Sequence, residues 1–466
     1  MTAALPFVDE LWSALGGSAH LIDRISVTGI GDLPSALRVT DLAVAVMGVA
    51  GLATSELVDT MADADADAAA AVTVDRELAS TWFGAVVSPV GWTLPSVWDP
   101  LARTYRARDG WIRLHTNAPH HRDRALEVLG VEGDLIAVTR AVRRWSATNL
   151  EREIVEAGGC ATAMHTREQW LAHPQGMAVA AEPLLHWQVG TRAADDGVSG
   201  WRPTSVRPLA GLRVLDLTRV IAGPVATRFL AMLGADVLRI DPPGWQEDAL
   251  LPDMTLGKRM ARLDAKRLDG AARLKQLLAG ADVIVHSYRE GALASIGLGR
   301  DSRSALRPGL IDVSLDAYGF TGPWAARRGF DSLVQMSNGI VQLGSAWAGG
   351  ETPTPLPVQA LDHTTGYLLA AATLRALTML RADGHGRTVR TSLARVGETL
   401  VQGGPLPVDG PLLGRAQPSV TLSTPWGDAR MLPAALEVRG VPFGFDQGPA
   451  ALGSSEPAWV VTAGRA

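Results

Sequence analysis

Asp362 stands where a reactive or structural carboxylate would be useful. It ends an apolar segment and opens a long alanine-rich run, residues 362–377, that is typical of a helix. A carboxylate at a helix N-terminus interacts favourably with the helix dipole, so the simplest interpretation is a helix cap. Asp331 follows the turn-rich sequence GlyPheThrGlyPro at the end of a predicted strand, where open α/β sheets bind ligands. His363 adjoins Asp362, and we expect it on the helix surface.

Histidines and a cysteine are the next candidates for chemistry. His115, His120 and His121 are close in sequence, but no cysteine or carboxylate joins them at a ligand spacing, so we expect a surface loop. Cys160 has no CxxC partner, which indicates a small buried residue rather than a nucleophile. The alternating acids of residues 62–71 lack the glycine and the bidentate glutamate of a calcium loop. We therefore expect no metal site.

The segment 208–241, PLAGLRVLDLTRVIAGPVATRFLAMLGADVLRID, organises the elements that must position these groups. Two runs rich in branched residues, 213–217 and 235–240, are typical of buried parallel strands. A glycine–proline turn and an apolar helix ending at Gly234 connect them into a right-handed βαβ unit. The turn lacks the G-x-G-x-x-G pattern, which disfavours a dinucleotide site with Asp241 on a ribose hydroxyl.

Strands and helices continue to alternate after this unit, and the pattern before it differs. Residues 281–286 and 310–315 predict further buried strands, so we expect an α/β fold with a doubly wound parallel, Rossmann-like domain over residues 207–400. Two short strands around an Asp109-Gly110 turn predict a hairpin in an α+β region within residues 1–206, whose first 60 residues read as helical. Residues 401–466 form a tail rich in proline and glycine, with one hairpin near residues 421–430.

The segment 208–241 resembles the opening of the family III CoA-transferases, the CaiB/BaiF family. The sequences GKRMARLDAKRLDG, SYREGALASIGL and the loop before Asp331 resemble three further motifs of that family. Residues 75–190 look like the family's small domain, yet they precede the CoA-domain sequence, the reverse of the usual order. Two histories explain this order. One is a circular permutation, and the other is a tandem fusion whose first copy lost its CoA-domain half and whose second copy lost its small domain. We favour the fusion, with residues 1–60 as the remnant of the lost CoA-domain half.

The resemblance implies a CoA domain that binds coenzyme A or an acyl-CoA as its substrate. The bound nucleotide half should lie at the C-terminal ends of the strands, against an apolar slot and cations for the phosphates. The positions that match the family's CoA contacts are Val220, Leu263, Lys266, Ser287, Tyr288 and Arg328. Ser287 and Glu290 depart from the asparagine and proline that are usual in the family.

The resemblance also places Asp362 on the family's catalytic aspartate and Asp331 on an acidic position that would assist it. Such an aspartate attacks an acyl-CoA thioester, passes through an aspartyl anhydride and an aspartyl-CoA thioester, and needs no metal or redox cofactor. The racemase branch uses a histidine at the position of Phe330, so racemisation is the weaker alternative, with His363 as a possible substitute base. A noncatalytic acyl-CoA-binding protein and a nicotinamide oxidoreductase remain as alternatives.

Composition and charge limit the partners that we expect. A net charge of −5 gives no basic field for nucleic acid. The longest apolar run, residues 42–53, is too short to span a bilayer, and the first ten residues lack the pattern of a signal peptide. One cysteine in 466 residues fits a reducing cytoplasm. By the resemblance, we expect a homodimer, since the family's subunits interlock and the site needs small-domain residues.

Overall fold

The structure is a computed structural model of the whole chain. It describes residues 5–61, 71–193, 201, 203–289, 291–407, 411–414 and 419–460. Most of the acidic run 62–71 and the unusual Glu290 lie outside the described residues.

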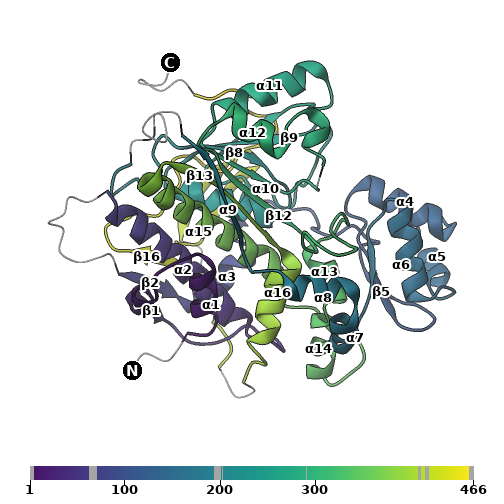
Figure 1. Cartoon of the computed structure of the whole chain (residues 1–466). Helices are drawn as coiled ribbons and strands as arrows, with labels where there is room; N and C mark the ends of the chain where they lie inside the picture. Colours follow the sequence, from purple (N-terminus) through teal and green to yellow (C-terminus); the bar gives the residue numbers. More distant parts are fainter. Residues whose placement is uncertain are drawn as a thin grey trace.

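A seven-stranded sheet forms the centre of the molecule (Figure 1). Its strands are β7 (His186–Arg192), β8 (Arg213–Leu217), β9 (Asp236–Asp241), β10 (Lys258–Arg262), β11 (Val283–His286), β12 (Ile311–Asp316) and β13 (His385–Ser392). The order is β10-β9-β8-β11-β12-β13-β7, and every pair is parallel except β13 with β7. The predicted α/β class with a mainly parallel sheet is therefore confirmed, whereas the doubly wound arrangement stays a prediction.

Alternate residues of the strands pack into two different apolar cores. Val214 and Val283 pack with the helices α9 (Ala222–Met232) and α15 (Ala360–Asp383). Their neighbours Leu215 and Ile284 pack with α11 (Leu268–Ala279). Because successive side chains of a strand point to opposite faces, helices cover both faces of the sheet.

The other helices around this sheet are short. They are α10 (Leu251–Met254), η2 (Ala294–Ile296), α12 (Arg300–Leu306), α13 (Asp331–Ser337), α14 (Ile340–Trp347) and α16 (Leu393–Gln402). α13 and α15 each begin with a turn that carries one of the two aspartates singled out above.

The N-terminal part packs against α15. Its elements are α1 (Val8–Ala14), η1 (Ala19–Arg24), β1 (Ile25–Thr28), α2 (Val39–Asp59), β2 (Val72–Asp75), α3 (Arg76–Trp82) and β3 (Val87–Pro89). α2 extends well beyond the apolar run noted in the sequence, and it has the length and mean hydropathy, 1.6, of a membrane span. However, 83% of that stretch is buried, and α2 lies along α15, as expected for a core helix.

The unit β1–α2–β2–α3 resembles the unit β12–α15–β13–α16, in which α13 and α14 are additional helices between β12 and α15. In both, the two strands pair in parallel and a long helix lies between them in the chain. In both, an aspartate is the third residue of the long helix, Asp41 in α2 and Asp362 in α15. In both, the second strand leads directly into a helix capped by a side chain, that of Asp75 or Ser392. The chain therefore contains two similar units.

A separate small domain lies beside the large sheet, at the right of Figure 1. Its sheet β4-β5-β6 and three helices enclose their own apolar core. These elements are β4 (Thr104–Arg106), β5 (Trp111–Leu114), α4 (Pro119–Leu129), α5 (Leu135–Val142), α6 (Ala147–Glu156) and β6 (Ala161–Ala163). The antiparallel β4–β5 pair confirms the predicted hairpin. The helices α7 (Arg167–Ala172) and α8 (Pro174–Ala181) lead from it to β7.

The C-terminal strands complete two small sheets begun by the N-terminal part. β14 (Val420–Thr424) and β15 (Gly427–Met431) form the expected hairpin, and β15 pairs with β3. β16 (Leu436–Val438) pairs with β2. The domain boundaries near residues 207 and 400 stay a prediction. β7, which precedes residue 207, belongs to the large sheet, and β14–β16, which follow residue 400, belong to the two small sheets.

Candidate active site

Asp331 and Asp362 meet at the N-terminus of α15. The carboxylate oxygen Oδ2 of Asp331 accepts hydrogen bonds from the backbone N–H groups of Leu361, at 2.9 Å, and Asp362, at 3.0 Å. Asp331 therefore supplies the cap of α15 from the start of a different helix. The N-cap residue of α15 is Gln359, which makes no side-chain cap bond. The structural interpretation of Asp362 as the helix cap is thus wrong.

The environment of the two carboxyl groups differs. Asp331 is 0% exposed and Asp362 is 8% exposed. Burial raises the pKa of Asp331 to about 6, against the opposing effect of the hydrogen bonds that it accepts. Burial raises the pKa of Asp362 well above its ordinary value, and the charge of Asp331 raises it further. No group in the described part of the chain donates a hydrogen bond to the Asp362 carboxyl, so Asp362 is the member of the pair that holds a proton.

Phe330, at the racemase histidine position, is packed under the histidines of the small domain. The His115 ring stacks on Phe330 with centroids 3.7 Å apart, and the His121 ring meets it edge-on at 6.0 Å. His115 and His121 are each 5% exposed, so the expected surface loop is wrong for both. His120 is exposed. Burial lowers the pKa of His115 to about 3 and that of His121 to about 4, which keeps both rings neutral.

His363 is buried, contrary to the expected surface position. Its ring stacks on Phe83, with centroids 5.2 Å apart, and the residue is 2% exposed. Burial lowers its pKa to about 3. A base with such a low pKa takes up a proton poorly near neutral pH, so His363 does not replace the missing racemase histidine.

The ends of β8 and β11 form a second group of functional candidates. Val220 has a φ of +67°, which is unusual for a β-branched residue, and its N–H donates to Glu247 Oε2 at 3.0 Å. The Arg219 guanidinium lies 5.1 Å from the ring centre of Trp245 and 5.2 Å from that of Tyr288. Strained backbone of this kind concentrates at ligand sites.

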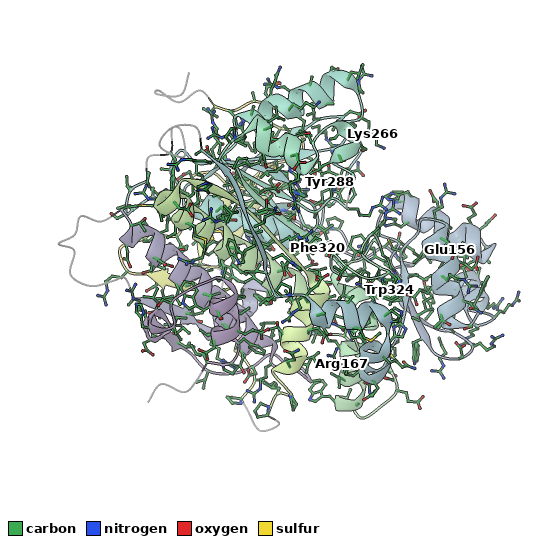
Figure 2. The ribbon with its side chains drawn as sticks, viewed as in Figure 1. Glu156, Arg167, Lys266, Tyr288, Phe320 and Trp324 are labelled. Carbon is green, nitrogen blue, oxygen red and sulfur yellow. The ribbon has the colours of Figure 1, made fainter. Side chains whose placement is uncertain are left out.

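The predicted CoA contacts are only partly brought together. Leu263 and Tyr288 pack against one apolar cluster, and Arg219 links Tyr288 to the turn that holds Val220. Lys266 and Ser287 are exposed. In Figure 2, Lys266 lies near α11, above Tyr288.

Arg328 faces the small domain. It donates to the carbonyl oxygen of Gly158 at 3.0 Å. Burial lowers the pKa of Arg289, and the charge of Arg328 lowers it further. Neither arginine forms an ion pair with any residue that the structure describes. Cys160, nearby, is 2% exposed, and burial raises its pKa to about 12, which confirms a buried residue and excludes a reactive thiolate.

The GlyPheThrGlyPro loop before Asp331 forms hydrogen bonds with the side chains of Glu182 and Gln175. Glu182 Oε1 accepts from the N–H groups of Phe320 and Thr321, both at 2.8 Å. The Gln175 side chain binds the loop through the carbonyl oxygen of Tyr318 and the N–H of Trp324. Figure 2 shows Phe320 and Trp324 between the large sheet and the small domain. These N–H groups are therefore not free for a ligand oxyanion.

Two cavities adjoin these groups. One, of about 550 Å³, lies at the ends of β11–β13 and includes Tyr288 and Arg289 in its lining. The other, of about 810 Å³, lies between the small-domain hairpin and the starts of α13 and α15. Asp241 is fully buried and ion-paired with Arg239, which removes it as a ribose ligand. Over the described ranges, no group of three or more histidine, cysteine or acidic residues is placed to hold a metal ion.

Sequence reasoning missed several residues of these sites. Arg219 adjoins Val220 in the same turn, and a cation at the end of a predicted strand is a signal that could have identified it. Glu247 carries no local pattern for its contact with Val220, because 27 positions separate the two residues in the chain. Trp245 reaches the same turn by packing on Arg219. Gln335 lies one helical turn after Asp331, to which it donates, but its residue type alone does not mark that contact.

Comparison with known proteins shows which family the second half of this chain resembles. Residues 209–413 match the model of CoA-transferase family III. The chain is 30% identical to an acetyl-coenzyme A transferase of Hypoxylon pulicicidum over 328 residues, covering 65% of this chain and 54% of that protein. It is 31% identical to a succinate–glutarate CoA-transferase of Agrobacterium fabrum, covering 42% of this chain and 53% of that protein. The chain spans about half the length of the curated relatives it matches.

Solved structures also resemble part of the chain. A CaiB/BaiF family protein from Brucella suis is 28% identical, covers 49% of this chain and 66% of its own, and has a TM-score of 0.38. A hypothetical protein from Mycobacterium tuberculosis is 31% identical, covers 43% of this chain and 58% of its own, and has a TM-score of 0.39.

Proposed function

We propose that the protein transfers CoA from an acyl-CoA thioester to a free carboxylic acid, with Asp362 as the nucleophile, since residues 209–413 match the model of CoA-transferase family III. Relatives named as CoA-transferases support this reaction class. CoA or acyl-CoA is then a substrate, and the chemistry requires neither a metal ion nor a redox group.

The reaction consists of four exchanges at the Asp362 carboxyl. The ionised carboxylate attacks the thioester carbonyl, which forms an aspartyl anhydride and releases the CoA thiolate. The thiolate then attacks the aspartyl carbonyl, which forms aspartyl-CoA and releases the first acid. The second acid attacks aspartyl-CoA, giving a new anhydride and the thiolate again. The thiolate finally attacks the carbonyl of the new acyl group, which yields the new acyl-CoA and restores Asp362.

One observation favours Asp362 over Asp331 as the nucleophile. Asp331 Oδ2 accepts two backbone hydrogen bonds, and its Oδ1 accepts one from Gln335 Nε2. Asp362 accepts none from the residues described here, so its oxygens are free to form a covalent bond. Asp331 acts instead as the assisting carboxylate, which holds the first turn of α15 and so positions Asp362.

We place the nucleotide half of CoA at the ends of β8, β10 and β11. Cations that form no ion pair with a described residue lie there and suit its phosphate groups, and the apolar slot suits the adenine ring. The proposed contacts remain Val220, Leu263, Lys266, Ser287, Tyr288 and Arg328. We add Arg219, which packs on Tyr288, and Arg289, whose pKa burial and the charge of Arg328 lower. Arg328 faces the small domain, so we assign it to the end of the CoA diphosphate that leads toward Asp362.

Racemisation remains the weaker alternative. Phe330 stands at the position of the racemase histidine, and the nearby His115 has a pKa of about 3. The site therefore lacks a histidine poised near neutral pH to move an α-proton.

A cytoplasmic homodimer stays a prediction. We expect a dimer because the family's site needs small-domain residues close to the aspartates. Arg113 and His115 of the small domain already lie near Asp331 and Phe330 of the same chain. Sedimentation at micromolar concentration measures the assembly directly.

Replacing Asp362 tests the proposed function. Asp362→Asn keeps the size of the side chain and removes the nucleophile, so we expect CoA exchange to fall by more than about 1,000-fold. CoA affinity, measured by calorimetry, should remain close to that of the wild type, because the phosphate contacts are unchanged. Asp383→Asn is the matched control, since it removes a carboxylate from the exposed end of the same helix. Exchange by Asp362→Asn at a rate within tenfold of Asp383→Asn would exclude Asp362 as the nucleophile.

A further inference from the structure

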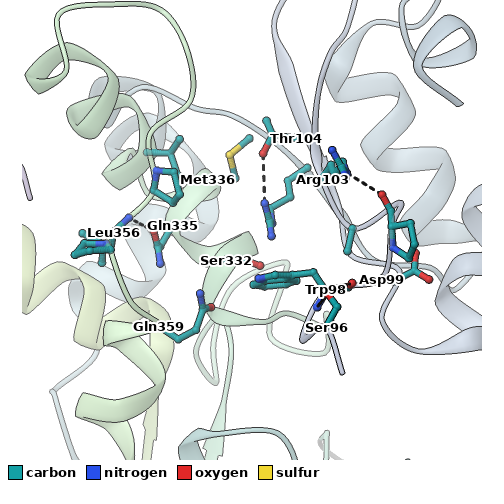
Figure 3. A pocket seen from close by; sticks show the side chains of 16 residues that line it. Ser96, Trp98, Asp99, Arg103, Thr104, Ser332, Gln335, Met336, Leu356 and Gln359 are labelled. Atoms are coloured by element: carbon teal, nitrogen blue, oxygen red, sulfur yellow. Dashed lines mark hydrogen bonds between the residues drawn. The ribbon is translucent and has the colours of Figure 1, made fainter. Parts of the chain in front are cut away.

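The larger cavity, of about 810 Å³, has the size of a binding pocket for an organic molecule. Figure 3 shows Thr104 of the small domain and Trp98, which precedes it in the chain, on one side. On the other side it shows Ser332, Gln335 and Met336 of α13 and Leu356, which precedes α15. The two domains therefore build this pocket together. Nothing in the proposed CoA site uses it, since the predicted CoA contacts lie outside its lining.

Most of the wall is apolar. The apolar side chains that line it are Trp98, Pro100, Ala102, Met336, Val341, Pro355, Leu356 and Pro357. A wall of this kind gains free energy by covering the carbon skeleton of a ligand. The pocket is thus suited to a molecule with an apolar body rather than to a small, fully hydrated ion.

Two buried polar atoms in the pocket lining have no partner. They are Nε of Arg113 and Oγ of Ser332. The Arg113 guanidinium lies 4.7 Å from the Trp98 ring centre, and its Nη1 is 3.5 Å from Thr104 Oγ1. It forms no ion pair with any described residue, although burial lowers its pKa. The charge of Asp331 opposes this effect of burial, but no carboxylate among the described residues is hydrogen-bonded to the guanidinium. A carboxylate ligand would supply that partner with two parallel hydrogen bonds.

The pocket reaches the aspartate pair through shared residues. Ser332, which lines it, directly follows Asp331 in α13. Gln335, also in the lining, donates from Nε2 to Asp331 Oδ1 and accepts the N–H of Leu356 at 2.8 Å. Gln359, the N-cap of α15, completes this end of the pocket. A molecule held here lies against the turn that carries Asp362.

We propose that this pocket binds the free acid that accepts CoA, that Arg113 holds its carboxylate, and that the acid has an apolar body. The proposal rests on the proposed function and names its acceptor class. In the acceptor step, one oxygen of the bound carboxylate attacks the carbonyl carbon of the aspartyl-CoA thioester at Asp362. The carbon–sulfur bond breaks, and the electron pair leaves with the CoA thiolate. Arg113 compensates the charge of the acid and orients it before attack.

The test combines binding with steady-state kinetics on the full chain. Octanoate and phenylacetate serve as apolar acids, and acetate serves as the small comparison. Calorimetry should show that both apolar acids bind more tightly than acetate. Arg113→Gln should weaken their binding and raise the KM for the acid by about 10- to 100-fold, with the KM for acyl-CoA nearly unchanged. Arg113→Lys should recover part of the loss, since it restores the charge without the planar fork.

Arg106→Gln is the matched control, because Arg106 is an exposed arginine on the same hairpin and lies over Trp111. It should bind the acids like the wild type. An unchanged acid affinity in Arg113→Gln, equal loss of acyl-CoA affinity, or no acid binding to the wild type would each overturn the acid pocket. Acid binding that depends on Arg113 in a protein that exchanges no CoA would instead support the pocket and refute the proposed function.

Discussion

Hydrogen bonding makes the two buried aspartates unequal. Asp331 accepts backbone and side-chain N–H groups that stabilise its charged form, whereas Asp362 receives none from the residues described. Two carboxylates this close do not both ionise readily, so the proton of the pair resides mainly on Asp362. The resting site must lose that proton before Asp362 attacks a thioester.

This charge arrangement predicts a pH dependence. The rate of the first exchange should rise with pH as Asp362 ionises, because its pKa lies well above the ordinary value. The negative charge of Asp331 is one cause of that increase, so Asp331→Asn should lower the pKa of Asp362. The rising limb of kcat/KM for acyl-CoA should therefore move to lower pH in this variant, as measured by a pH–rate profile. The asparagine oxygen still accepts from the N–H groups of α15. A limb that stays in place or moves to higher pH would contradict the assignment of the proton.

Sequence indicated the two aspartates as candidates but not their surroundings. The helix that follows Asp362 was evident from its alanine-rich pattern, and the structure confirms it. The cap of that helix comes from Asp331, which no local pattern reveals. His363 and His115 were expected at the surface, and both are covered by rings from distant segments, Phe83 and Phe330. Burial that depends on such distant contacts is not encoded in the neighbouring sequence.

At the scale of elements, the turn after β8 stores backbone strain. Val220 is held at a φ of +67° while its N–H is bound by Glu247, and the preceding Arg219 packs against Trp245 and Tyr288. These contacts fix the turn at the strand ends where we place CoA. Strain is tolerated at such a site because the surrounding contacts determine the conformation.

Two substitutions at Val220 separate strain from packing. Glycine normally destabilises a protein relative to alanine, but at a positive φ the order reverses. We expect the free energy of unfolding of Val220→Gly to exceed that of Val220→Ala by about 1 kcal/mol in urea denaturation. Both variants should bind CoA more weakly than the wild type, because both lose the isopropyl group. If the alanine variant proved the more stable, the turn would not be strained in solution.

The strands of the large sheet differed in how well the sequence predicted them. β8, β9, β11 and β12 are buried runs of branched residues, and each was evident. β7 is a half-exposed edge strand that joins the sheet antiparallel to β13, and its mixed sequence gave no such signal. β16 pairs with β2 from the other end of the chain, a contact that local patterns cannot predict.

At the scale of the whole molecule, the two similar units bear on the reversed domain order, whose origin stays a prediction. A circular permutation would contain each element once, whereas here β1–α2–β2–α3 and β12–α15–β13–α16 both occur. This repetition favours the tandem fusion, with the N-terminal part as the remnant of a second CoA domain. Under this hypothesis, the contact between α2 and α15 joins the corresponding helices of the two copies.

The two copies differ at the aspartate. Asp41 is held by ion pairs with Arg76, at 2.8 Å, and Arg38, at 3.2 Å. Asp362 has no such partner among the described residues. Ion pairing stabilises a carboxylate and weakens it as a nucleophile, so we assign one reactive carboxylate to each chain.

Covalent trapping tests the central claim, that Asp362 carries the acyl and CoA groups, most directly. The full-length protein is incubated with an acyl-CoA and hydroxylamine, which converts an aspartyl anhydride or aspartyl-CoA into a stable hydroxamate, and the digest is examined by mass spectrometry. We predict one hydroxamate per chain, at Asp362, that requires acyl-CoA and is absent from Asp362→Asn. Modification at Asp331 or Asp41, or an unmodified Asp362 in a preparation that exchanges CoA, would contradict the claim.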